Sequence, residues 1–551
     1  YISVTGVQTC ALPICLSIIS NAYHSSEAMI KRAVGADEAY HVIPAGTGAT
    51  GAIHKLQQIL GVYIPPAAKE KITQAAERAF PRETVAGLGR ELEREKPVVF
   101  IGPYEHHSNE ISWRECFADV VEIDLGPDGG VDLSDLERKL ALPEYGGRRK
   151  IGSFSAASNV TGVLTPVFEI TRILHAAGAL AFFDYAASAP YVPIRMRGPE
   201  GIDLDGIMFS PHKLIGGPGS CGLLIIHEKI YPRNLAPSTA GGGTVRFVSR
   251  EYQDYVDNIE ERESAGTPGI LQMMRAALSL SIKERIGGHR IMEMERAHLA
   301  HGLSILEKES AIHVLGDNVA RGCRFGRLAI LSCVVKSGNA YFHPGFVGRL
   351  LNDLFGVQAR AGCSCAGPYG HRLFGIDDMR SLEYRHLIAE GNEGIKPGWV
   401  RIGFHFLMTE EEVEYICEAL RFIARRGKYF LPLYDFDLHT ARFTPRGFSE
   451  GEPRFGLEEA LRFAGDGESA AGVTAAGMDP AGSAAAGPAA AANAAGWAAG
   501  PAAAKTEAQE SEFARWLAEA EAAADRLEKE YRPENERLTE SPLYPYIYYR
   551  E

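Results

Sequence analysis

Residues 206–219 read GIMFSPHKLIGGPG, and this stretch decides how the central part of the chain is interpreted. Its apolar start is typical of a strand buried on both faces of a sheet. The glycines near its end let the backbone approach a ligand closely. Lys213 is therefore expected at a strand end, in the kind of confined polar pocket that lowers the pKa of an amine and that a Schiff-base lysine requires. The alternative for such a lysine is a solvated surface position.

Similar apolar runs recur before this stretch, separated by amphipathic segments such as 168–174. This alternation favours an α/β domain with a mostly parallel sheet. Ligands bind at the carboxyl ends of the strands in such sheets. We expect strands at 40–44, 98–101, 120–123, 150–154, 180–184 and 206–210.

A second block follows, from about residue 286 to 430. The sequence predicts an α+β arrangement that is smaller than the first block. We therefore expect a large domain over 16–285 and a small domain over 286–435. The predicted elements of the second block are helices at 290–307, 347–355 and 410–423 and strands at 328–335 and 399–404.

The composition changes after residue 436. Ala and Gly dominate residues 464–504, which bury too little apolar area to offset the entropy of ordering. We expect residues 436–510 to be irregular and then a linker, and residues 511–531 to form a helix. The aromatic residues at 543–549 are expected either to dock on the rest of this chain or on a partner, or to stay in solvent. One helix face would carry Phe513, Trp516, Leu517 and Leu527.

The first 15 residues do not resemble the start of a folded domain. Residues 4–14, VTGVQTCALPI, look like a translated sequencing adapter, so residues 1–15 are expected to be an artefact. The alternative is a signal peptide whose apolar region runs over 10–19. That region has no positively charged segment before it and no clear cleavage site after it.

The composition bounds the kind of protein. The 551 residues are 46% hydrophobic and 23% charged, as in a globular protein of several domains. The net charge of −13 argues against nucleic acid or anionic lipid as a partner. No apolar run reaches the ~20 residues of a membrane helix. Nine cysteines do not make a disulfide framework in a chain of this length, which favours a cytoplasmic location.

Two features point to a bound cofactor. Asp184 ends the apolar run 180–183, where a buried carboxylate needs a partner. A protonated pyridine nitrogen is one such partner, as in pyridoxal phosphate, and a turn or N-cap Asp is the alternative. Residues 45–52, AGTGATGA, lie between a predicted strand and a helix and would cradle a phosphate. They lack the Gly-Lys-Ser/Thr of a nucleotide P-loop. The candidate phosphate-binding residues are Thr47, Gly48, Ala49 and Thr50.

This order of phosphate loop, aspartate and Ser-x-His-Lys resembles the pyridoxal-phosphate-dependent enzymes of fold type I. Within them the chain is similar to the class V aminotransferase superfamily, on the cysteine desulfurase and selenocysteine lyase branch, over about residues 20–425. The resemblance implies a pyridoxal 5′-phosphate cofactor and a small amino acid as substrate. It matches Lys213 to the lysine that binds the cofactor covalently, and Ser210 and His212 to cofactor and phosphate contacts.

The resemblance also assigns residues outside this core. His106, in the run EHHSN at 105–109, matches a catalytic histidine that stacks on the cofactor ring. Asn159 matches a residue near the cofactor oxygen and the substrate. Thr267, in the run AGTP at 265–268, matches a segment that reaches the partner subunit's phosphate. The resemblance thereby implies a homodimer with a shared active site, whereas the residues alone indicate an ordinary turn.

In the second block, RAGCSCAGP at 360–368 resembles the desulfurase loop. Cys365 falls on the catalytic sulfur-accepting position, and its Gly- and Ala-rich flanks favour a mobile, accessible loop. Arg360 falls near the substrate, and Arg401 on the arginine that binds the substrate carboxylate, a bidentate task that suits a guanidinium. The alternative for Arg401 is a solvated strand residue. The alternatives for the loop are a buried, inert Cys365 or a Cys-x-Cys that forms half of a metal site. No matching Cys/His pair is evident for a metal, and we expect none.

The chain also departs from the family pattern. Ala187 stands where a glutamine is common, and Cys363 and Ser364 replace two histidines. The expected function is a pyridoxal-phosphate lyase that removes sulfur or selenium and leaves alanine, with a sulfur-acceptor protein as a candidate partner. An aminotransferase or β-eliminating lyase needs Lys213 but not Cys365. A degenerate scaffold that only binds is the non-enzyme alternative.

Overall fold

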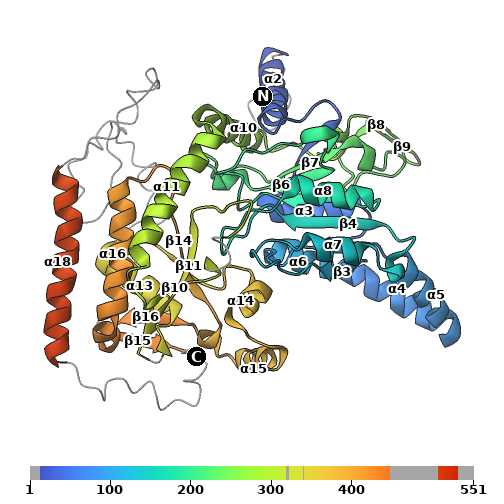
Figure 1. Ribbon diagram of the computed structural model, residues 1–551. Helices are drawn as coiled ribbons and strands as arrows, with labels where there is room; N and C mark the ends of the chain where they lie inside the picture. The colour runs from blue at the N-terminus through green and yellow to red at the C-terminus, as the bar shows by residue number, and fades with distance from the viewer. Residues whose placement is uncertain (1–12, 318–321, 339, 447–506, 531–551) are drawn as a thin grey trace, which may run out of the picture.

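The computed structural model describes residues 13–317, 322–338, 340–446 and 507–530 (Figure 1). Its centre is a seven-stranded sheet of order β1-β7-β6-β5-β4-β2-β3. Only β7 runs antiparallel to its neighbours, so the expected α/β fold with a mostly parallel sheet is confirmed. The strands are β1 (Tyr40–Pro44), β2 (Val98–Ile101), β3 (Asp119–Glu122), β4 (Lys150–Ser155), β5 (Leu180–Asp184), β6 (Gly206–Phe209) and β7 (Leu223–His227).

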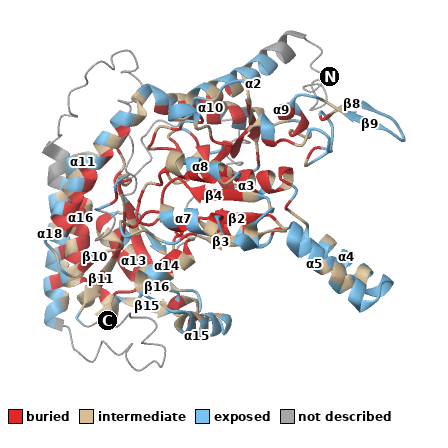
Figure 2. Ribbon diagram, turned by 45° about the vertical axis from the view of Figure 1, so that its right-hand side comes forward, coloured by how far each residue is buried: buried red, intermediate tan, exposed pale blue. Residues whose placement is uncertain are grey.

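Both faces of this sheet are covered, as the buried strands in Figure 2 show. Val98 and Phe100 pack into a core with helices α2, α8 and α10, whereas Val99 and Ile101 pack with α3 on the other face. Alternate residues of one strand therefore serve two cores, which explains the continuous apolar runs. The helices of this part are α2 (Pro13–Ala33), α3 (Gly48–Ile59), α6 (His107–Arg114), α7 (Leu133–Leu140), α8 (Val167–Ala176), α9 (Ile259–Arg262) and α10 (Ile270–Ile286).

A smaller α+β unit follows, with an antiparallel sheet of order β10-β11-β14-β13 and β12 paired to β11. Helices α11, α13 and α16 bury their apolar faces in its core. The expected helices and strands of the second block are present, with ends shifted by a few residues. The elements are α11 (Gly288–Leu306), β10 (Ile312–Val314), β11 (Ile330–Ser337), β12 (Ala340–Tyr341), α13 (Pro344–Phe355), β13 (Arg360–Gly362), α14 (Gly367–Phe374), α15 (Asp378–Ala389), β14 (Trp399–Gly403) and α16 (Glu410–Arg426).

The chain after residue 433 differs in part from expectation. β15 (Tyr434–Asp437) and β16 (Arg442–Pro445) form a hairpin, so the expected irregular chain from residue 436 is wrong for these residues. Phe436 stacks on Phe443 with ring centroids 4.4 Å apart, which fixes the pairing. The predicted linker at 464–504 and the aromatic end at 543–549 lie outside the described residues.

Helix α18 (Glu507–Glu530) packs along the small unit beside α16 (Figure 1). Phe513 stacks on Tyr415 with ring centroids 4.3 Å apart. The four apolar residues predicted for one helix face all pack against the core of the small unit. The sequence prediction of an amphipathic helix is therefore confirmed.

Two projecting elements were not expected. Helices α4 (Pro66–Ala79) and α5 (Arg82–Glu95) extend away from the large sheet and bury no residue (Figure 2). β8 (Val245–Val248) and β9 (Gln253–Tyr255) form a second projecting hairpin. No helix within the described ranges is long and apolar enough to cross a membrane. The 3₁₀ segments are η1 (Pro143–Tyr145), η2 (Pro199–Gly201), η3 (Pro211–Lys213), η4 (Glu228–Ile230), η5 (Glu393–Ile395) and η6 (Gly427–Leu433).

Candidate active site

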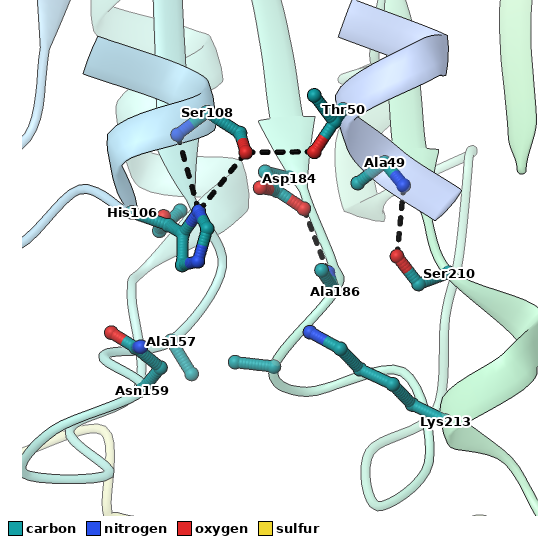
Figure 3. A pocket seen from close by; sticks show the side chains of 12 residues that line it. Ala49, Thr50, His106, Ser108, Ala157, Asn159, Asp184, Ala186, Ser210 and Lys213 are labelled. Atoms are coloured by element: carbon teal, nitrogen blue, oxygen red, sulfur yellow. Dashed lines mark hydrogen bonds between the residues drawn. The ribbon is translucent and has the colours of Figure 1, made fainter. Parts of the chain in front are cut away.

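A pocket of about 420 Å³ opens where the parallel strands of the large sheet end (Figure 3). Ser155 is the last residue of β4, Asp184 is the last residue of β5, and η3 with Lys213 follows β6. Open α/β sheets place ligands at this edge. The residues that line the pocket are Ala49, Thr50, His106, Ser108, Ser155, Ala157, Asn159, Asp184, Ala186, Ala187, Ser210 and Lys213.

The structure brings half of the predicted site residues to the lining of this pocket. Ala49, Thr50, His106, Asn159, Asp184, Ser210 and Lys213 line it directly. Thr47 is the N-cap residue of α3, directly before the helix that carries Gly48. Thr267 is exposed in the turn before α10 and does not line the pocket of its own chain. Ser108 and Ser155 were not predicted, because a serine carries no distinctive signal outside a motif.

The N-terminus of α3 approaches the loop after β6 very closely. Gly48 has a φ of +69°, and a Cβ on it would lie 2.7 Å from Cε1 of His212 and 2.8 Å from Oγ of Ser210. The backbone N–H of Ala49 donates to Oγ of Ser210 at 2.8 Å. Glycine is therefore required at residue 48 for this close approach, which lies beside a helix N-terminus that favours anions.

Asp184 and Lys213 form the charged centre of the pocket. Asp184 is 4% exposed, and its Oδ1 accepts from the N–H of Ala186 at 2.8 Å. Burial raises the pKa of Asp184, while the Ala186 N–H and the Lys213 charge oppose that shift. Burial of the amine lowers the pKa of Lys213, against the pull of Asp184, although the residue stays accessible from the cavity. Figure 3 shows the Lys213 amine pointing toward Asp184 and Ala186.

His106 forms the opposite wall. Its Nδ1 accepts from the N–H of Ser108 at 3.1 Å, so the proton of the neutral ring is on Nε2. Burial, with the nearby charge of Lys213, lowers the pKa of His106 to about 4, and the ring is neutral at pH 7. The Ser108 hydroxyl also bonds the Thr50 hydroxyl at 2.7 Å, which ties this wall to α3. A flat neutral ring in this place suits stacking on an aromatic ligand.

Glu105 braces the same wall from behind. One carboxylate oxygen accepts from the N–H of Ser155 at 2.8 Å, and the other accepts from its hydroxyl at 2.6 Å. Asn109 donates to the second oxygen at 2.7 Å. Burial raises the pKa of Glu105 to about 7. The carboxyl thus holds β4 and α6 together beneath the pocket.

The loop with Cys365 is docked on the large domain. The N–H of His107 donates to the Cys365 carbonyl at 2.9 Å, and Nε2 of His107 accepts from the N–H of Gly367 at 3.0 Å. On the other side, Nδ2 of Asn159 donates to the Ser364 carbonyl at 2.8 Å. Cys365 is half-buried. Hydrogen bonds from two segments of the large domain therefore fix its backbone.

Two arginines meet beside this loop. Arg360 on β13 lies directly opposite Arg401 on β14. Nη2 of Arg360 lies 3.2 Å from Sγ of Cys365, and Nη1 of Arg401 donates to the Asn159 carbonyl at 3.1 Å. Burial, together with the charge of Arg360, lowers the pKa of Arg401. Like charges on opposed residues are unfavourable, so this pair is best satisfied by an anion such as a carboxylate.

The residues present fit pyridoxal phosphate. The buried Oδ1 of Asn159, which lines the pocket, has no hydrogen-bond partner among the described residues. The helix N-terminus at Ala49 and Thr50, which line the pocket, suits the phosphate, and the buried Asp184 carboxylate suits a protonated ring nitrogen. Within the described ranges, no group of three or more His, Cys, Asp or Glu side chains is arranged to hold a metal ion.

Known proteins provide an independent comparison. A sequence model described as aminotransferase class-V matches residues 83–416. A cysteine desulfurase from Synechococcus elongatus is 28% identical over 60% of this chain and 46% of its own length. A probable cysteine desulfurase from Mycobacterium leprae is 29% identical over 51% of this chain and 62% of its own. The chain thus spans about half the length of these two curated relatives.

Solved structures agree on the fold. A cysteine desulfurase from Thermococcus onnurineus superposes with a TM-score of 0.54 at 22% identity, over 75% of this chain and 86% of that one. A cysteine desulfurase from Escherichia coli gives a TM-score of 0.54 at 19% identity, over 74% of this chain and 85% of its own. At these identities the likeness establishes the fold alone, and it matches the fold-type I architecture expected from the sequence.

Proposed function

The chain belongs to the class-V aminotransferase family, and from that premise we propose that it is a pyridoxal-phosphate-dependent lyase of the cysteine desulfurase or selenocysteine lyase kind. The substrate is a small amino acid, and alanine is one product. The observation that carries this proposal is the placement of Cys365, with Arg360 at its sulfur, on a loop docked beside the pocket of Lys213 and Asp184. An enzyme that needed no thiol would have no use for a cysteine held there.

Each charged residue has a distinct task in this proposal. Arg401 and Arg360 bind the substrate carboxylate, because their opposed guanidinium groups need a shared anion. Lys213 binds the cofactor, and its Nζ is placed to take a proton from the substrate Cα, which its lowered pKa favours. Asp184 holds a proton on the pyridine nitrogen. When bound, the cofactor supplies an electron sink for the carbon from which the proton leaves.

The neutral wall of the pocket orients the cofactor. His106 stacks on its ring, and Asn159 donates toward Ser364 while its free Oδ1 faces the pocket. Ser210, His212, Thr47, Gly48, Ala49 and Thr50 surround the phosphate. Cys365, with Arg360 at its sulfur, would attack the substrate sulfur; the bond from that sulfur to the substrate Cβ would break, its electron pair would stay with the carbon, and Cys365 would carry the sulfur as a persulfide.

We also propose a homodimer whose site is completed by Thr267 of the partner subunit. This assignment is supported by the exposed position of Thr267 away from its own pocket. The same proposal includes a large domain over 16–285 and a small domain over 286–435. It also includes a cytoplasmic location and a sulfur-acceptor protein as partner.

The test is a product assay on the full-length protein with pyridoxal phosphate and a panel of amino acids. Cysteine is expected to yield two products, alanine and a sulfur atom that is passed first to Cys365 as a persulfide. Cys365→Ser is expected to lose both products while it still binds the cofactor, and Cys221→Ser serves as a matched control at a half-buried cysteine elsewhere. A reaction untouched by Cys365→Ser would place the enzyme with the aminotransferases or eliminating lyases.

A further inference from the structure

Cys363 lies two residues before Cys365 and has no task in the function proposed above. The N–H of Ala366 donates to the Cys363 carbonyl at 3.1 Å, which closes a turn over residues 363–366. The two central residues, Ser364 and Cys365, have φ values of +53° and +56°. Both φ angles are positive, as in a type I′ turn, a conformation that residues with a Cβ rarely adopt.

The large domain enforces this turn. Asn159 holds the Ser364 carbonyl, and the backbone of His107 holds the Cys365 carbonyl. Both strained residues are therefore fixed by hydrogen bonds from elements that also form the pocket. Strain retained in this way is typical of functional sites.

The turn shortens the span between the two cysteines toward that of a disulfide. Two steps of fully extended chain span about 6.6–7.2 Å. A closed turn shortens that span, and the Cα atoms of disulfides lie about 4.4–6.8 Å apart. Cys363 is half-buried and packs against the core of the large domain. For a persulfide on Cys365, Cys363 is thus a neighbouring nucleophile in the same turn, with the advantage of an intramolecular reaction.

Arg360 favours the same chemistry. Its Nη2 lies 3.2 Å from Sγ of Cys365 and stabilises negative charge that develops as a bond to that sulfur breaks.

We propose that Cys363 is a resolving thiol that releases the sulfur as hydrosulfide. The Cys363 thiolate attacks Sγ of the Cys365 persulfide, and a Cys363–Cys365 disulfide forms. The bond from Sγ to the outer sulfur breaks, and its electron pair leaves with that sulfur, which already carries the proton, as HS⁻. The outer sulfur gains two electrons and the two cysteines lose them. A dithiol reductant in solution then restores both thiols. This inference rests on the proposed desulfurase function.

The experiment uses the full-length holoenzyme, reduced and then freed of reductant under anaerobic conditions. Cysteine is added, and sulfide is measured per alanine formed. After quenching with an alkylating agent, mass spectrometry follows the tryptic peptide 361–372, AGCSCAGPYGHR, which contains both cysteines. The wild type is expected to release about one sulfide per alanine in a single turnover, with a peptide that is two hydrogens lighter and not alkylated.

Cys363→Ser is expected to release almost no sulfide and to keep a peptide heavier by one sulfur atom. Cys221→Ser is the matched control and is expected to behave as the wild type. A wild-type protein that keeps its persulfide, on Cys365 or moved to Cys363, would overturn the inference while the desulfurase proposal stands. Absence of alanine would overturn the proposed function and this inference with it.

Discussion

Replacing Gly48 with alanine tests the predicted phosphate cradle. The new Cβ would lie 2.7 Å from Cε1 of His212 and 2.8 Å from Oγ of Ser210, closer than real Cβ contacts. The φ of +69° also disfavours alanine, by about 1–2 kcal/mol in the left-handed region. Moving the His212 or Ser210 side chain off its rotamer costs about 0.5–1.5 kcal/mol more.

These two effects sum to about 1.5–3.5 kcal/mol within the loop proposed to hold the phosphate. We expect Gly48→Ala to weaken pyridoxal-phosphate binding about 10- to 300-fold, since about 1.4 kcal/mol corresponds to a factor of ten. The assay is a titration of the apoprotein followed by the absorbance of the bound cofactor, with urea unfolding of the apoprotein in parallel.

Gly89→Ala is the matched control. Gly89 lies in the exposed helix α5, and no atom lies within 4 Å of a Cβ placed there. Alanine at that position is expected to add about 0.5–1 kcal/mol of stability without an effect on cofactor binding. Equal cofactor affinity in Gly48→Ala and Gly89→Ala would refute the assignment of the α3 N-terminus as the phosphate site.

Three further changes probe the charged centre, a buried lysine and the docked loop. Asp184→Ala should lower turnover about 1,000-fold, or about 4 kcal/mol of barrier, with a smaller loss of cofactor binding, and near-normal turnover would remove Asp184 from the mechanism. Burial lowers the pKa of Lys283, which bonds the Val192 carbonyl, from its usual 10.5 to about 8. The buried charge of Lys283 therefore lowers the free energy of unfolding by about 3 kcal/mol below pH 8. The free energy of unfolding recovers as the pH rises from 8 to 10.5. Urea unfolding of Lys283→Met should show no such increase with pH. His107→Ala should speed alkylation of Cys365 several-fold, and an unchanged rate would show that the side chain of His107 does not hold the loop.

The sequence sufficed for the parts of the site that local patterns specify. Asp184 and Lys213 each follow a continuous apolar run, and that run predicts both a buried strand and its end at the ligand-binding edge. The proposed phosphate loop can also be predicted locally, because glycine and hydroxyl residues at a strand-to-helix turn form a local signal.

Features that depend on distant pairing could not be predicted. Arg360 and Arg401 face each other only because β13 and β14 pair in one register. The side chain of His107 holds Gly367, 260 residues further along the chain, and no local pattern predicts that contact. Helices α4 and α5 were not predicted, and they bury no residue in the structure.

Reductive trapping of the cofactor tests directly whether Lys213 binds it covalently. The holoenzyme is treated with borohydride, digested and mapped by mass spectrometry for the lysine that carries the cofactor. We expect that Lys213 alone is labelled and that Lys213→Ala loses the label. A label on another lysine, such as the buried Lys283, or no label at all, would contradict it.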